Sequence, residues 1–132
     1  MSEREERAQA RAVITDALSR RLSFDDFYAR WPDSGDPLIA AIFDETEDTI
    51  EHTPGSVFRP GRAQDRFQRC IPYKTLVVDG QLLLDSFADV PSHRLLEIRE
   101  RFLKEVDLDQ DDEALMKATR EFVAREVAGD SA

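Results

Sequence analysis

This sequence has few of the residues that most catalytic and metal sites require. Its 132 residues include only two histidines and one cysteine, Cys70, so an internal disulfide is excluded. It contains no glycine-rich phosphate loop, zinc-ligand spacing, His-Glu-x-x-His pair or nucleophile elbow. We therefore predict no catalytic residue, no bound metal and no cofactor.

Long apolar runs and a basic surface are also missing. No stretch approaches the roughly 20 apolar residues of a membrane span, and the charged start MSEREERAQARAV is unlike a signal peptide. The formal net charge is −10, whereas a nucleic-acid binder normally needs a basic surface. We expect a cytoplasmic protein that binds neither membranes nor nucleic acid.

Apolar residues recur at helical spacing through most of the chain, and its length suits one domain. This spacing predicts helices over about residues 3–20, 23–31, 37–52, 92–105 and 111–128. The predicted fold is a single all-α domain spanning 1–132, a compact bundle of five to six helices. Its predicted core includes Phe24, Phe27, Ile39, Ile42, Phe43, Ile50, Leu95, Phe102 and Phe122.

Helix-capping residues support several of these boundaries. Asp36 is placed to cap a helix that begins with Pro37, and either Asp111 or Asp112 is placed to cap the last helix. Gly129 is typical of a helix C-terminal stop, so we expect the last helix to end there.

Residues 71–87 allow two structures. Asp79-Gly80 between apolar runs is a strong hairpin signal, and a hairpin over 75–85 would make the fold α+β. Pro72 instead suits a first helical turn, and the leucines that follow lack the β-branching typical of strands. We favour a helix here.

Negative charge is concentrated in one segment. Residues 31–53 contain seven acids and no Lys or Arg. The helix over 37–52 places acids at i, i+3, i+4 and i+7, and each i, i+4 pair of like charges destabilises the helix by about 0.2–0.5 kcal/mol. The acids of this stripe are Asp44, Glu45, Glu47, Asp48 and Glu51.

Three interpretations of the acidic stripe remain open. It could be a solvated face, it could be paired internally, or it could be a surface for a basic protein partner. The internal bases that could pair with it are Arg59, Arg62, Arg66 and Arg69. A partner surface would also include Asp33 and Asp36, together with the nearby aromatic residues Tyr28 and Trp31, because such aromatics are typical interface anchors.

The segments ALSRRLSFDDFYARWP and DPLIAAIFDETEDTIEHTPG resemble small bacterial helical proteins related to the colicin D immunity protein. The resemblance covers about residues 10–55, and Arg20-Arg21 departs from the small-residue-glycine step of that family. The matching positions are Leu18, Leu22, Ser23, Phe24, Asp26 and Phe27.

The resemblance implies a non-enzymatic immunity protein that binds the basic catalytic domain of a toxin, possibly a nuclease. The partner-binding residues would then be the acidic stripe with Asp33, Asp36, Tyr28 and Trp31. Two other functions stay open: a helical adaptor or regulatory protein with a solvated acidic face, and a metal- or ligand-binding bundle enzyme.

Overall fold

Six α-helices and one 3₁₀ turn form the part of the chain that the computed structural model describes, which is residues 2–19, 24–52 and 72–130. No strand occurs within these ranges, so the prediction of an all-α bundle is confirmed. The elements are α1 (Glu3–Leu18), α2 (Phe24–Arg30), α3 (Pro37–His52), α5 (Pro72–Leu82), η1 (Asp85–Phe87), α6 (Ser92–Glu105) and α7 (Asp112–Asp130).

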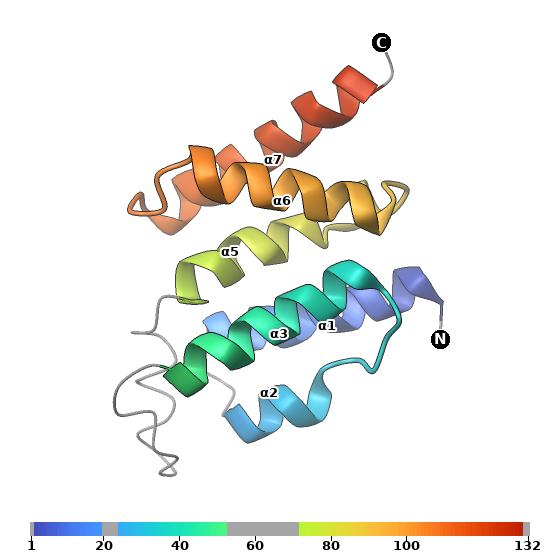
Figure 1. Ribbon diagram of the computed structural model, residues 1–132, viewed down its shortest axis with the longest axis vertical. Helices are drawn as coiled ribbons and strands as arrows, with labels where there is room; N and C mark the ends of the chain where they lie inside the picture. The colour runs from blue at the N-terminus through green and yellow to red at the C-terminus, as the bar shows by residue number, and fades with distance from the viewer. Residues whose placement is uncertain (1, 20–23, 53–71, 131–132) are drawn as a thin grey trace.

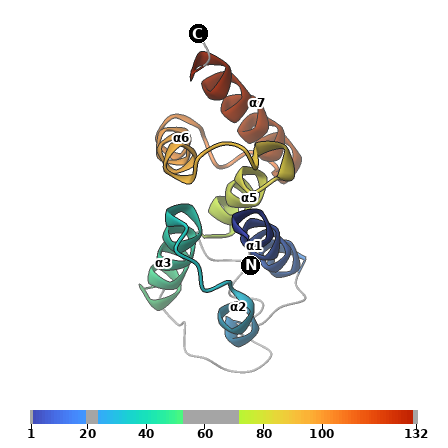
Figure 2. The ribbon, with the colours of Figure 1, turned by 90° about the vertical axis from the view of Figure 1, so that its right-hand side faces the viewer.

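Helix α5 is the central element of the bundle. It lies between α1 and α3 on one side and α6 and α7 on the other (Figures 1 and 2), and it contacts all four of these helices. Every residue from 75 to 83 is buried. Helix α2 lies at the far end of the molecule from α7, beside α1 and α3.

The segment whose structure the sequence left open is therefore a helix. Because α5 is covered on all sides, it has no polar face, and its apolar residues follow no helical period. Gly80 lies inside this helix, where a Cβ would be 3.4 Å from the Cγ2 atom of Ile14. This distance is an ordinary van der Waals contact, so the glycine is an interior helix residue packed against α1 and does not form a hairpin turn.

The capping predictions are confirmed at two helix starts and wrong at one helix end. The Asp36 carboxylate accepts a hydrogen bond of 2.9 Å from the backbone N–H of Leu38 at the start of α3. Asp111 accepts one of 2.9 Å from Ala114 at the start of α7. Gly129, however, lies within α7, because a solvent-exposed last turn tolerates glycine at a cost of about 1 kcal/mol.

Most of the predicted core residues are buried. Phe27, Ile39, Ile42, Leu95, Phe102 and Phe122 all belong to the main apolar cluster. Phe43 is only half-buried and packs at the edge of that cluster, so its placement in the core was wrong. The side chains of Phe24 and Ile50 lie outside the described residues.

A buried arginine joins the N-terminal ends of three helices. Arg7 of α1 is 3% exposed, and its guanidinium donates hydrogen bonds to Glu3, Asp36 and Ser92. It also donates to three backbone carbonyls between residues 87 and 90. Asp36 therefore caps α3 and at the same time partly neutralises Arg7, which ties α3 to α1.

Candidate protein-binding surface

Four aromatic rings form a cluster between α2 and α3. Phe27 is buried at its centre, 5.1 Å from Trp31 and 6.5 Å from Phe43 in stacked arrangements. Tyr28 meets Phe43 edge to face at 5.5 Å. Tyr28, Trp31 and Phe43 are all half-buried, so each keeps part of its surface at the outside of the molecule.

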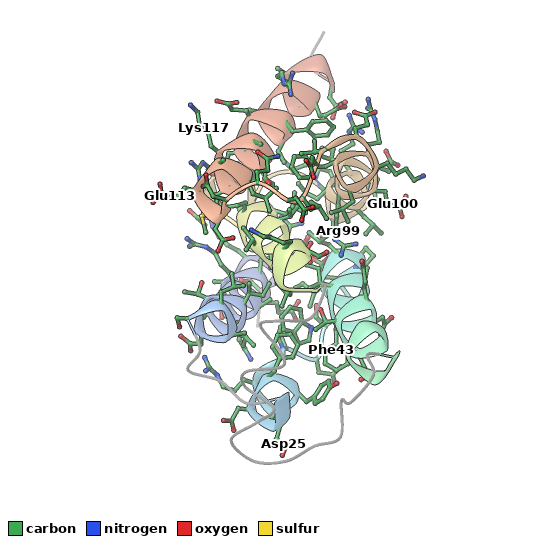
Figure 3. All side chains as sticks on the ribbon, turned by 90° about the vertical axis from the view of Figure 1, so that its left-hand side faces the viewer. Asp25, Phe43, Arg99, Glu100, Glu113 and Lys117 are labelled. Atoms are coloured by element: carbon green, nitrogen blue, oxygen red, sulfur yellow. The ribbon has the colours of Figure 1, made fainter. Side chains whose placement is uncertain are left out.

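These half-buried rings line a depression that we call the α2–α3 hollow. Its volume is about 280 Å³, and in Figure 3 Phe43 lies between α3 and α2. Two predicted site acids, Asp33 and Asp44, are among the residues that line it. The complete lining is Tyr28, Trp31, Pro32, Asp33, Ser34, Ile39, Ala40, Phe43 and Asp44.

Hydrogen bonds to α1 hold this end of the molecule in place. The Gln9 side chain donates to the backbone carbonyl of Arg30 at 2.8 Å, and Arg30 forms an ion pair of 2.7 Å with Asp16. In the connection that follows, Ser34 donates to Glu6 at 2.6 Å. These contacts hold α2 and the connection that follows it against α1. A surface held in this way favours binding without large rearrangement.

The predicted acidic stripe does not form one uniform surface. Asp33 and Asp44 are exposed and Glu47 is half-buried, and none of the three has an ion pair within the described ranges. An exposed acid that the sequence reasoning omitted, Asp25, lies on the outer side of α2 (Figure 3). The following side chains lie outside the described residues: Asp48, Glu51, Arg59, Arg62, Arg66 and Arg69.

Two of the predicted partner-binding acids serve the fold itself. Asp36 is 8% exposed and is occupied by Arg7 and by the start of α3, so it cannot extend the surface patch. Glu45 is partly exposed but forms an ion pair with Arg99 of α6. Neighbouring positions on a helix point about 100° apart, so Glu45 faces α6 while Asp44 faces the hollow.

Arg99 also neutralises a carboxylate in the centre of the bundle. Its Nε atom donates to Asp79 of α5 at 2.6 Å, and Asp79 is 1% exposed. Burial raises the pKa of Asp79 from 3.8 to about 6, although the charge and hydrogen bonds of Arg99 act in the opposite direction. Burial alone would lower the pKa of Arg99, but Asp79 and then Glu45 outweigh it, so its pKa is raised and it stays charged.

The indole of Trp31 is poorly satisfied in this structure. Its Nε1 atom is buried and donates to no acceptor in the described part of the molecule. Leaving such a donor unpaired costs about 1–3 kcal/mol. This indole therefore weakens the fold at the surface that surrounds the hollow.

Sequence reasoning missed a larger depression on another side of the bundle. It has a volume of about 570 Å³ and lies between α1, α5 and α7. Its charged residues are Arg11, Asp112 and Arg120, and Asp112 is already paired with Lys74. Because each helix contributes only part of the lining, no local sequence pattern could have predicted it.

The described residues also bear on the other functional classes. They contain no group of three His, Cys, Asp or Glu side chains able to hold a metal ion, and no helix among them is long and apolar enough to cross a membrane. No family model, curated protein or solved structure matches this chain. The resemblance to colicin D immunity proteins therefore rests on the sequence motifs alone and stays a prediction.

Proposed function

We propose that this chain is a protein-binding protein, and specifically an immunity-type inhibitor that neutralises a basic bacterial toxin domain. The observation that carries the proposal is the composition of the α2–α3 hollow. There, the partly exposed rings of Tyr28, Trp31 and Phe43 lie beside the carboxylates of Asp33 and Asp44. Aromatic anchors next to unpaired charge are typical of the residues that dominate protein–protein binding energy.

The charges explain how such an inhibitor would reach its target. A toxin that cleaves nucleic acid needs a positive cleft to hold phosphates, and the net charge of −10 attracts such a cleft over a distance. Charge complementarity mainly increases the association rate, whereas desolvated aromatic contacts mainly slow release. Fast capture followed by slow release is what protection from a toxin requires.

The arrangement also explains why like charges persist on α3. Asp44 contacts no base in the described ranges, so it adds no ion-pair stability to the fold. A residue that does little for folding yet lines a hollow is better explained by an external partner. By contrast, Glu45 and Asp36 have internal partners and are not part of the proposed surface.

The test uses Asp44→Lys, with Glu100→Lys as the matched control. Glu100 is an exposed acid that points outward from α6, away from the hollow (Figure 3). The partner to be tested is the product of any toxin gene found next to the gene for this chain, and binding is measured by surface plasmon resonance at low and physiological salt. We expect Asp44→Lys to slow association about tenfold or more and Glu100→Lys to change it far less.

Stability and protection complete the experiment. Asp44→Lys should leave the free energy of unfolding within about 0.5 kcal/mol of the original protein, since it breaks no ion pair and relieves like-charge repulsion. The original protein should also block the toxin's activity in cells, which distinguishes an inhibitor from an adaptor that binds without inhibiting. Equal association of Asp44→Lys and the original protein would refute the proposed surface.

A further inference from the structure

We propose that the α2–α3 hollow receives one arginine side chain of the partner protein. This inference rests on the proposed function, because it names the group that the same surface recognises. The hollow combines two chemistries that a guanidinium requires, aromatic ring surface and carboxylate oxygens.

The aromatic rings of the hollow pack against one another. Trp31 and Phe43 are tilted by 31° to each other with their centroids 6.2 Å apart, and Tyr28 is inclined by 74° to Phe43. These rings need little reordering when a cation enters. A cation beside such rings is attracted by their negative faces, and Trp is the strongest of the three types in this respect.

The carboxylates supply the matching charge. Asp33 comes from the connection between α2 and α3, and Asp44 comes from the second turn of α3, so the two acids reach the hollow from different segments. Both are exposed and neither is paired with a base within the described ranges. A cation in the hollow would therefore gain a partner without breaking an existing ion pair.

The size of the hollow favours a single side chain. Pockets for cofactors and drug-sized ligands have volumes of roughly 300–1,000 Å³, and this open hollow has about 280 Å³. Arginine fits its chemistry better than lysine, because a planar guanidinium stacks on aromatic rings and can donate to two carboxylates at once. A lysine ammonium is a compact, strongly hydrated charge that gains less from stacking.

Trp31 is the only tryptophan in the chain, so its fluorescence reports directly on the hollow. The full chain is titrated with N-acetyl-arginine amide, with the lysine amide, and with the citrulline amide, which has nearly the same shape as arginine but no charge. We expect a saturable change with the arginine amide, at lower concentration than with the lysine amide. The citrulline amide should bind about tenfold more weakly or not at all.

Variants test whether the carboxylates of Asp33 and Asp44 bind the guanidinium. Asp33→Asn combined with Asp44→Asn should weaken binding of the arginine amide about tenfold, whereas Glu100→Gln on α6 should leave it unchanged. Circular dichroism verifies that each variant is as helical as the original chain. Equal binding of the citrulline amide, tighter binding of the lysine amide, or no saturable change in the original chain would each overturn the inference.

The two proposals can fail separately. If the arginine amide has no effect but Asp44→Lys still slows association with the toxin, the arginine hollow is refuted and the inhibitor function stands. If the arginine amide binds as expected but no adjacent toxin is inhibited, the hollow is supported and the inhibitor function is refuted.

Discussion

The buried carboxyl of Asp79 makes the stability of this protein depend on pH in an unusual direction. Burial raises its pKa from 3.8 to about 6 in the folded chain, despite the nearby guanidinium of Arg99. A raised pKa means that folding favours the protonated carboxyl. Its stabilising contribution is therefore fully present below pH 4 and is lost as pH rises through about 6.

The magnitude follows from the size of the shift. A shift of about two pKa units, at 1.36 kcal/mol per unit, corresponds to about 3 kcal/mol, and most of this change falls between pH 4 and 7. The variant Asp79→Asn keeps the shape of the side chain and one of the two oxygens that accept from Arg99, and it does not titrate. The unfolding free energy of the original protein minus that of Asp79→Asn should therefore fall by about 3 kcal/mol as pH rises over this range.

Urea unfolding followed by circular dichroism at several pH values measures this difference. Subtracting the variant removes the titration of the other carboxylates, since both proteins contain them. If the original protein instead gains stability relative to Asp79→Asn as pH rises, then the ion pair with Arg99 outweighs burial. The pKa of Asp79 would then be lowered, and our reasoning on this pair would be wrong.

Two further variants test how the helices are joined. Arg7→Lys should lower the free energy of unfolding by about 1–3 kcal/mol, because an ammonium keeps the charge but cannot donate to all the buried acceptors around Arg7; an unchanged free energy in urea unfolding would contradict this. Gly80→Ala should raise the free energy of unfolding by up to about 1 kcal/mol, since alanine favours the helix and its Cβ would meet Ile14 only in ordinary van der Waals contact at 3.4 Å; a clear loss of stability in a thermal melt would contradict this.

The helices themselves could be predicted from local patterns. Amphipathic segments such as α3 and α6 have one apolar face, and their starts and ends agree with the sequence to within a residue or two. Helix α5 was ambiguous for a physical reason, since full burial of residues 75–83 removes the alternation between polar and apolar positions. In such a helix the hydrophobic pattern carries no information about its period.

The site was only partly predictable, because charges pair across long separations in sequence. Tyr28, Trp31, Asp33 and Asp44, which the sequence analysis grouped in one candidate surface, line one hollow. Asp36 was expected at the surface but is buried against Arg7, 29 positions away. Nothing in the local sequence of these residues distinguishes an acid that meets a buried arginine from one that meets solvent.

The two internal anchors of α3 have a consequence for how this surface can evolve. Asp36 joins the start of α3 to Arg7, and Glu45 joins its middle to Arg99. Asp33 and Asp44 form no such ion pair within the described ranges. Substitutions at positions 33 and 44 can therefore accumulate with little effect on folding. A lineage under pressure to match a changing partner could alter these two positions without first acquiring compensating mutations in the core.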